Sequence, residues 1–388
     1  MAFEELIDCL IKIEMNKQLE KIRKIFIVLP DLGGGGAERL HVNLANEWVA
    51  KNLNVEFVLL RNRGELIKLL SPKITVTSLN VDRIRDSILP LAAHFRQSRP
   101  EVVIVAMWPL TSAVVFSWLL SGCVGKLFLS EHENLSHSYI RQHRARPVIL
   151  RNLIRFTYPL ATGIIAVSHG VLEDVRSLGS LSIDMGRVIY NPTATGVSSC
   201  RESLDVQDQL WGVGFERHIL TVGRLSTQKD HETLIKAFAL ITKIFNAKLV
   251  ILGEGKLRAV LLALVEELGL QERVSLPGFE VNPYPWYRSA DLFVLSSRWE
   301  GFGNVLVEAL ECGLPVVSTN CPSGPEEILE KGRYGKLVPI QDPESLANAM
   351  IQSLNETHDR DVLTERAQDF AVSKISDEYL GCIFPEGY

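Results

Sequence analysis

Short apolar runs alternate along the chain with stretches whose apolar residues recur at helical spacing. Twelve runs have the length of a strand: IFIVLP, VEFVLL, ITVTSL, VVIVA, KLFLS, GIIAVS, RVIYNP, HILTVG, AKLVILG, RVSLPG, LFVLSS and PVVST. Strands that alternate with helices are typical of a parallel sheet covered by helices on both faces. Because twelve strands are too many for one small doubly wound domain, the pattern predicts an α/β protein with two such sheets.

A polar stretch, TATGVSSCRESLDVQDQLWGVGFE, separates the seventh apolar run from the eighth and is typical of an irregular linker. We expect two Rossmann-like domains facing each other across a cleft, over residues 22–198 and 199–375, with ligands beyond the carboxyl ends of the strands. Residues 1–21 are predicted to be an amphipathic amino-terminal extension. Residues 376–388 are predicted to be a carboxy-terminal helix that can return to the first domain.

The composition is that of an ordinary globular protein and argues against several classes. Of 388 residues, 46% are hydrophobic and 22% charged, and a net charge of −5 gives no general attraction to nucleic acid. The cysteines are scattered without CxxC or cysteine–histidine metal spacing, which is typical of a reduced, cytosolic chain. The amino terminus has early acids and no clean apolar core with a cleavage site, so a secretory signal is not expected.

One uncharged stretch, residues 102–125, is long enough to cross a membrane. Its interior contains Trp108 and Pro109 followed by threonine, serines and a glycine. We therefore favour a buried strand, a turn and a buried helix over a transmembrane helix, since buried parallel strands are apolar throughout.

The segment SRWEGFGNVLVEAL places Glu300 and Glu308 eight positions apart around a bend that contains two glycines. In one continuous helix these carboxylates would lie roughly 12 Å apart along the axis, too far to share a ligand. The glycines favour instead a strand, a tight loop and a helix that starts near Asn304. Free N–H groups at a helix start suit a phosphate, and carboxylates on either side suit the hydroxyls of a sugar and a ribose. The alternative is an unrelated surface acid and a helix-starting acid.

Three further motifs follow predicted strands and can converge on one cleft. In PDLGGGGAERL, Gly33–Gly36 would let the backbone approach a ligand, unless they form a flexible turn; the GxGxxG spacing of a nicotinamide site is absent. In TVGRLSTQKD, Arg224 and Lys229 can neutralise a pyrophosphate, unless they are solvated surface charges. In SEHEN, His132 would lie at the cleft edge, although a lone histidine is more often structural than chemical.

In this order the motifs resemble the retaining glycosyltransferases of family 4, which have the GT-B fold and an E-x7-E signature. The resemblance runs from Ile25 to about Leu380 and rests on GGAERL, EHEN, VSHGV, IYNP, VGRLSTQKD, LGEG, LPGF, EGFGNVLVEAL and GLPVVSTNCPSGPEEIL. It implies transfer of a hexose or N-acetylhexosamine from a nucleotide sugar, by first guess a UDP sugar, to a glycan acceptor without a cofactor. The alternatives are a nucleotide-sugar epimerase or hydrolase of the same fold, a phosphorylase-like enzyme and a non-catalytic sugar-binding module.

The resemblance also implies roles for the matching residues. Glu308 would hold the ribose, Arg224 and Lys229 the diphosphate, and Glu300 the donor sugar without acting as a covalent nucleophile. The catalytic residues would be His132, Arg224, Lys229 and Glu300. The donor site would comprise Gly35, Gly36, Arg224, Lys229, Gly253, Phe279, Glu300, Gly301, Phe302, Gly303, Asn304 and Glu308.

Two features of the motifs qualify that comparison. Glu326 in SGPEEIL stands where many relatives have a basic residue, which puts a cationic contact there in doubt. No DxD motif that could hold a metal against a pyrophosphate stands out, so we expect no metal.

The segment YIRQHRARPVILRNLIRFTYPLA is rich in arginine and has no acid. An apolar side is supplied by Val148, Ile149, Leu150, Leu153, Ile154 and Phe156. This composition suits a helix lying on an anionic membrane, with Arg141, Arg144, Arg146 and Arg151 near the acceptor; the alternative is a solvated arginine face over a buried stripe. In the membrane interpretation the acceptor is a lipid-linked glycan, and the protein is cytoplasmic and peripheral on the inner face of the cytoplasmic membrane. Otherwise the acceptor is soluble.

Overall fold

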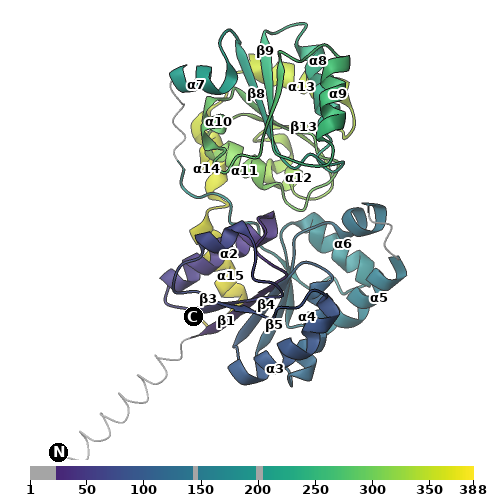
Figure 1. Cartoon of the computed structure of the whole chain (residues 1–388), viewed down its shortest axis with the longest axis vertical. Helices are drawn as coiled ribbons and strands as arrows, with labels where there is room; N and C mark the ends of the chain where they lie inside the picture. Colours follow the sequence, from purple (N-terminus) through teal and green to yellow (C-terminus); the bar gives the residue numbers. More distant parts are fainter. Residues whose placement is uncertain (1–22, 143–146, 198–203) are drawn as a thin grey trace, which may run out of the picture. The chain divides into compact units, whose positions relative to one another are not determined.

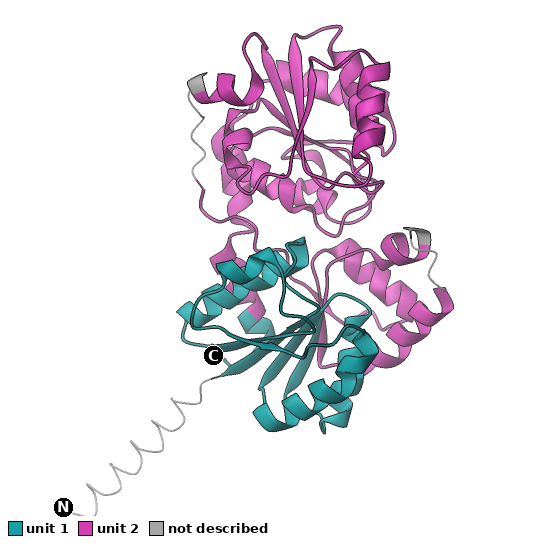
Figure 2. Ribbon diagram, in the orientation of Figure 1, with its two compact units in different colours: residues 1–129, 380–388 teal, residues 130–379 magenta. Residues whose placement is uncertain are grey.

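The computed structural model of the chain describes residues 23–142, 147–197 and 204–388 (Figure 1). They form two β-sheets whose strands alternate with helices along the chain, as the apolar pattern predicts. The chain divides into two compact units, residues 1–129 with 380–388 and residues 130–379 (Figure 2).

The first sheet has seven strands in the order β3-β2-β1-β4-β5-β6-β7, and each pairing whose register is described is parallel. Its strands are β1 (Lys24–Leu29), β2 (Asn54–Leu59), β3 (Thr75–Ser78), β4 (Val102–Ala106), β5 (Lys126–Glu131), β6 (Gly163–Ala166) and β7 (Arg187–Val188). The helices that alternate with them are α2 (Gly36–Ala50), α3 (Ile88–Ser98), α4 (Leu110–Leu120), α5 (Pro147–Thr157) and α6 (His169–Gly179). Single helical turns lie at Glu65–Leu69, Ile84–Ser87 and Tyr158–Leu160.

The second sheet has six parallel strands in the order β10-β9-β8-β11-β12-β13. Its strands are β8 (Arg217–Val222), β9 (Ala247–Leu252), β10 (Val274–Gly278), β11 (Leu292–Leu295), β12 (Val316–Thr319) and β13 (Lys336–Val338). Its helices are α7 (Leu204–Trp211), α8 (His231–Ile241), α9 (Arg258–Glu267), α10 (Tyr284–Ser289), α11 (Asn304–Glu311), α12 (Pro325–Ile328), α13 (Pro343–Asn355) and α14 (Arg360–Gln368), with one further turn at Glu330–Gly332. The last helix, α15 (Val372–Ile383), ends in residues that belong to the other compact unit.

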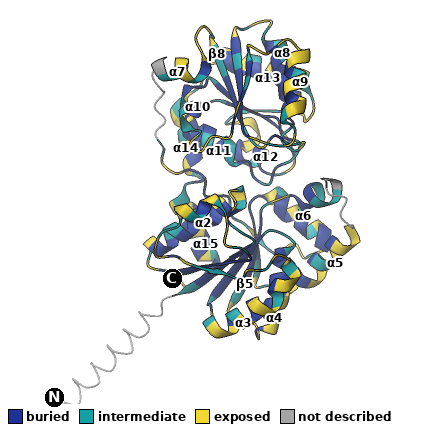
Figure 3. Ribbon diagram, in the orientation of Figure 1, coloured by how far each residue is buried: buried dark blue, intermediate teal, exposed yellow. Residues whose placement is uncertain are grey.

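All twelve predicted strands are present, and β13 is a thirteenth that the pattern did not reveal. With only three residues, β13 is too short to show a periodicity. The strands are the most buried elements, and the helices turn an exposed side outward (Figure 3). Burial of apolar strands from both faces explains why these runs show no alternation.

The stretch at residues 102–125 folds as expected, into the buried strand β4, a turn at Trp108 and Pro109, and the helix α4. Within the described part of the chain, the helices are too short or too polar to cross a membrane.

The stretch predicted to be an irregular linker contains a helix, α7, so that part of the prediction is wrong. Trp211 at the end of α7 is buried, its ring packs edge-on against Trp286, and its Nε1 donates to Ser289 Oγ at 2.8 Å. Tertiary packing of one tryptophan thus stabilises a helix in a polar segment.

The structure describes two helical elements in the arginine-rich segment. A π-helix covers Ser136–Gln142 and α5 starts at Pro147, while Arg144 and Arg146 lie outside the described residues. Pro147 is the first described residue of α5, and proline is favoured in the first turn of a helix.

The end of the chain packs with residues 1–129. Arg23 pairs with Glu101 at 2.6 Å and with Glu386 at 3.4 Å, and its guanidinium lies 4.5 Å from the centre of the Phe384 ring. Lys126 also pairs with Glu386, at 3.1 Å. The domain boundaries drawn from the sequence stay predictions.

Candidate active site

The E-x7-E segment has the predicted form of strand, loop and helix, β11 followed by α11. Gly303 caps α11 at φ +105, a backbone conformation that favours glycine. A Cβ on Gly301 would lie 1.9 Å from the carbonyl oxygen of His132. Glycine at 301 is therefore required because another backbone passes against it.

Glu300 is buried, with 5% of its surface exposed, and receives two short hydrogen bonds. Lys229 Nζ and Ser297 Oγ each lie 2.6 Å from Glu300 Oε1. Two residues that the sequence singled out separately, Glu300 and Lys229, therefore form one ion pair. A charge pair in such a position interacts more strongly than one in water.

The loop around Glu300 is held from several sides. Arg298 donates through its backbone N–H to Gln228 O and through Nη2 to Asp230 Oδ1, both at 2.8–2.9 Å. Gln228 Nε2 donates to Trp299 O at 3.1 Å. Strands β8 and β11 are neighbours, so these contacts join the loops at their carboxyl ends.

Arg224 lies in the loop after β8, exposed, and has no ion-pair partner among the residues that the structure describes. Its loop packs tightly against the loop after β9. A Cβ on Gly253 would lie 2.1 Å from Gly223 O, and Gly253 N donates to Gly278 O at 2.7 Å. Glycine at 253 thus allows the backbones of the two loops to pack closely, next to Arg224.

Glu308 lies on α11, half-buried, and accepts a hydrogen bond from Tyr287 Oη at 2.8 Å. Burial, together with the nearby Glu308 carboxylate, raises the pKa of Tyr287 well above its usual value, so the phenol stays protonated and donates. The helix begins at Asn304, which puts Glu308 at the start of its second turn. It stands about 6 Å along the axis from the helix start.

The two aromatic residues of the predicted donor site differ in burial. Phe279, after β10, is 71% exposed and presents its ring to solvent. Phe302 is buried in a cluster with Tyr190 and Phe370, at ring distances of 5.5 and 5.4 Å. A contact between residue 302 and a donor would therefore come from its backbone.

His132 follows β5, as predicted, and its Nε2 lies 2.9 Å from Ser130 Oγ. Its carbonyl oxygen packs against Gly301, while Ser168 Oγ donates to Gly301 O at 2.7 Å. The structure thus brings His132 next to the Glu300 loop.

Gly35 and Gly36 lie in the other compact unit, at the start of α2. Gly35 caps this helix with extended backbone, and Gly33 N donates to Asp31 Oδ1 at 3.2 Å. A Cβ on Gly34 would meet nothing within 4 Å. This loop is therefore open at Gly34, whereas the Glu300 loop is enclosed at Gly301.

The helix α5 combines a buried stripe with an exposed apolar face. Leu150 and Ile154 are buried, whereas Val148, Ile149 and Phe156 are exposed. Arg151 and Arg155 are exposed too. Of the predicted acceptor residues, only Arg151 has a described side chain.

Several residues that were not predicted from the sequence form hydrogen bonds with the predicted site residues or with the loops that carry them. They include Asn191, Thr193, Ser297, Asp230, Tyr287 and Arg298. Asn191 could have been found, because it stands in the motif IYNP; the hydroxyl and phenol partners carry no spacing signal.

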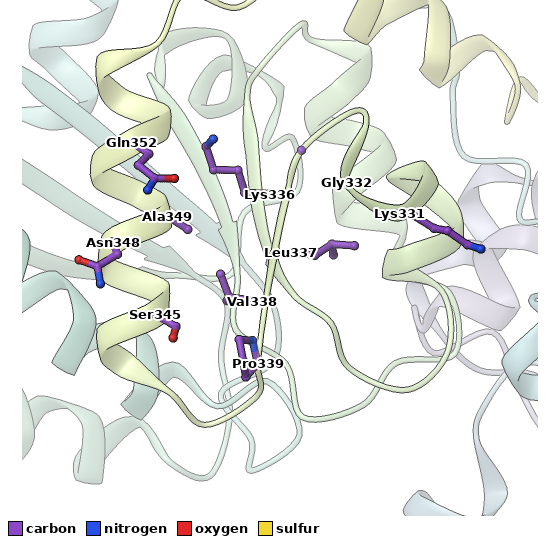
Figure 4. Close-up of a pocket in the computed structure, with 11 residues that line it drawn as sticks. Lys331, Gly332, Lys336, Leu337, Val338, Pro339, Ser345, Asn348, Ala349 and Gln352 are labelled. Atoms are coloured by element: carbon purple, nitrogen blue, oxygen red, sulfur yellow. The ribbon is translucent and has the colours of Figure 1, made fainter.

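A groove of about 500 Å³ lies away from these residues, between α13 and the edge strand β13 (Figure 4). Its lining includes Lys331, Lys336, Ser345 and Gln352, and contains none of the predicted site residues. Glu326, the departure noted in the sequence, is exposed on α12. Among the described residues, no three histidine, cysteine or acidic side chains gather as a metal site would require.

Two family descriptions match the chain in succession. "Glycosyltransferase Family 4" matches residues 34–196 and "Glycosyl transferases group 1" matches residues 213–370. The chain belongs to the GT-B glycosyltransferases of the family 4 type.

Relatives with named activities match along nearly the whole length. A Campylobacter jejuni enzyme, N-acetylgalactosamine-N,N'-diacetylbacillosaminyl-diphospho-undecaprenol 4-alpha-N-acetylgalactosaminyltransferase, is 29% identical over 92% of this chain and 99% of its own. The lipopolysaccharide core biosynthesis glycosyltransferase LpsE of Rhizobium meliloti is 29% identical over 89% and 93%. Both relatives are named as glycosyltransferases, the class to which this chain belongs.

Solved structures confirm the fold. Anabaena HepE in complex with UDP and glucose has a TM-score of 0.76 at 22% identity, covering 93% of this chain and 99% of that one. The apo galactosyltransferase WaaB of the lipopolysaccharide outer core has a TM-score of 0.74 at 20% identity, covering 94% and 99%.

Proposed function

We propose that the protein transfers a hexose or N-acetylhexosamine from a UDP sugar to a lipid-linked glycan with retention of anomeric configuration and without a metal. The observation that carries the proposal is the Lys229–Glu300 pair beside the exposed Arg224, at the carboxyl ends of β8 and β11. The solved structure of HepE with UDP and glucose supports a UDP sugar as donor.

The site offers positive charge where the leaving group needs it. Cleavage of the bond from the anomeric carbon to the diphosphate puts negative charge on the leaving phosphate. Arg224, Lys229 and the N–H groups at the start of α11 would stabilise that charge. Preorganised donors of this kind act most strongly where water is excluded.

Glu300 would hold the donor sugar and stabilise the positive character that grows on its ring. Its carboxylate is tied to Lys229 and Ser297, which fixes its position and limits its use as a nucleophile. In the proposed reaction the acceptor hydroxyl attacks on the face that the leaving group vacates. The acceptor's proton passes to the leaving phosphate oxygen, so no second carboxylate is needed.

For the acceptor, we propose a lipid-linked glycan reached from an anionic membrane surface. The exposed apolar residues Val148, Ile149 and Phe156 share one side of α5 with Arg151 and Arg155. This arrangement lets apolar side chains enter the headgroup region while the arginines attract anionic lipid. The named activity of the Campylobacter relative, on an undecaprenol diphosphate glycan, supports the same class of acceptor.

Thermal unfolding with a panel of UDP, GDP, ADP and CMP sugars tests the donor. We expect a UDP sugar to raise the melting temperature, because a ligand that binds the folded state stabilises it. Stabilisation should persist with EDTA. Stabilisation by another nucleotide alone would make the UDP assignment wrong, and stabilisation by none would overturn the donor site.

Turnover tests the reaction. With the stabilising donor, NMR of the product should show the anomeric configuration of the donor. An inverted product would contradict retention. Activity that is lost with EDTA and restored by magnesium or manganese would contradict metal independence.

Vesicle sedimentation tests the membrane surface. Binding should require anionic lipid, fall with salt because surface charge is screened, and fall again when Arg151 and Arg155 become Ser. Arg187→Ser, at an exposed arginine on β7, is the matched control and should bind as the parent does. Equal sedimentation with neutral and anionic vesicles, or none with either, would leave a soluble acceptor as the better assignment.

A further inference from the structure

The segment after β7, residues 189–197, lies along the full length of α11. At the start of the helix, Asn191 Nδ2 donates to Asn304 Oδ1 at 2.7 Å. At its end, Glu311 Oε1 accepts the backbone N–H groups of residues 195–197 at 2.6–3.1 Å. One helix is therefore bound at both ends to the segment that leads from the first sheet to the second.

That segment is itself fixed by the second passage of the chain between the sheets. Phe370 O accepts the N–H groups of Thr193 and Ala194, at 3.0 and 3.1 Å, and Val372 N donates to Ala194 O at 3.1 Å. A parallel bridge joins Ala194 to Ala371. Backbone hydrogen bonds to residues 370–372 thus hold the segment that carries Asn191.

Asn191 is 94% buried, since only 6% of its surface is exposed. Its Oδ1 has no hydrogen-bond partner among the residues that the structure describes. A buried, unpaired amide oxygen opposes folding, and an apolar side chain of similar size would avoid that cost. The amide is therefore better explained by its bond to Asn304 than by packing.

We propose that Asn191 is a positioning residue for sugar transfer: it fixes the Asn304 side chain and with it the first turn of α11. The proposal rests on the donor site proposed above, where the N–H groups of that turn hold the diphosphate. Since Asn304 Oδ1 already accepts from Asn191, the side chain of Asn304 is a structural element of the helix start, and its backbone faces the donor. Holding the N–H groups in place before the donor arrives lowers the cost of ordering them.

Asn191→Leu is the sharpest test, because it removes the bond to Asn304 and also the unpaired oxygen. We expect a melting temperature no lower than that of the parent, and about 10-fold weaker binding of UDP by calorimetry. A residue with only a structural role would lower the melting temperature and leave UDP affinity unchanged. Asn246→Leu is the control, because it removes a loop hydrogen bond, to Gly214 O at 2.6 Å, before β9. It should bind UDP as the parent does.

A double-mutant cycle with Asn304→Ala tests whether Asn191 acts through Asn304. If Asn191 acts through Asn304, Asn191→Leu should weaken UDP binding little further in the Asn304→Ala background. Losses that multiply would overturn the proposal, as would parent-like binding by Asn191→Leu.

Hydrogen exchange separates a failure of this proposal from a failure of the donor assignment. Backbone amides of residues 304–308 should exchange faster in Asn191→Leu without any ligand, because the helix start is released. If the parent itself binds no UDP, the donor assignment fails and exchange alone decides: faster exchange supports the proposal, and unchanged exchange overturns it.

Discussion

Two glycine-rich turns follow a strand and begin a helix in this protein, one at Gly33–Gly36 and one at Gly301–Gly303. In the first, a Cβ on Gly33 would meet only the Asp31 side chain, at 3.1 Å, and one on Gly34 would meet nothing. In the second, Gly301 lies against the backbone of His132. Similar sequence patterns thus serve different needs. The first turn has room beside Gly33 and Gly34, although a Cβ on Gly35 would lie 2.5 Å from Glu38 Oε2, whereas the second turn lets two backbones touch.

The ion pairs beside the turns differ in the same way. Glu300 and Lys229 are largely buried, whereas Asp31 pairs with Arg63, whose side chain is 60% exposed, at 2.8 Å. A surface pair contributes little to stability, while breaking a buried pair leaves an uncompensated charge. The enclosed turn should therefore be sensitive to substitution, and the open turn tolerant.

The largest contrast is expected between alanine substitutions in the two turns. Gly301→Ala should lower the free energy of unfolding by about 4 kcal/mol or more, because a backbone must move. Gly33→Ala should change it by less than about 0.5 kcal/mol, since a flexible carboxylate can give way. Urea unfolding measures both. Equal stability of the two variants would remove the contrast.

Breaking the ion pairs should give the next largest effect. Lys229→Met should destabilise the fold by about 3 kcal/mol, because Glu300 would be buried without its partner. It should also lower turnover by about 10²–10³-fold through loss of charge at the leaving group. Arg63→Met should change stability by less than about 1 kcal/mol. If Lys229→Met matched the parent in stability and in turnover, the ion pair would contribute to neither.

A smaller effect is expected from the second glutamate of the enclosed turn. Glu308→Ala should weaken UDP binding by about 1.5–3 kcal/mol, the scale of a hydrogen bond to a charged group. Tyr287→Phe should weaken it less, since the phenol only orients Glu308. Calorimetry measures both, and unchanged affinity in Glu308→Ala would make the ribose assignment wrong.

The smallest difference concerns pH. Burial lowers the pKa of His41, on α2 behind the open turn, to about 4, and that of His231, beside Lys229, to about 3. Both lie below the ordinary value of 6.5, so the unfolded state binds more protons as the pH falls. Their contribution is complete above pH 6.5 and is lost as the pH falls toward 4 and 3.

At pH 5, each histidine should lower the free energy of unfolding by about 2 kcal/mol relative to neutral pH. His41→Gln and His231→Gln should each reduce the acid sensitivity of urea unfolding by a similar amount. They should diverge only below pH 4, where His41 takes up its proton in the folded state and His231 does not. Acid sensitivity unchanged in both variants would contradict the two shifts.

The sequence could predict the strands because most of them are continuous apolar runs, buried from both faces; β3 and β7, at the two edges of the first sheet, are less buried. It could also predict the bend between Glu300 and Glu308, since glycines interrupt an otherwise helical pattern. It could not predict α7 or β13, because a single buried tryptophan stabilises the first and pairing with β12 the second. Neither interaction leaves a periodic trace in the local sequence.

For the site, local sequence determined which residues stand at strand ends: Arg224, Lys229, His132 and Glu300. That Lys229 meets Glu300, that Gly301 rests on His132 and that Asn191 holds Asn304 were decided only by tertiary structure. The reason is separation along the chain: these pairs lie 71 to 169 positions apart. Local periodicity reports which side of an element is buried, whereas the packing of sheets and loops decides which distant side chain it meets.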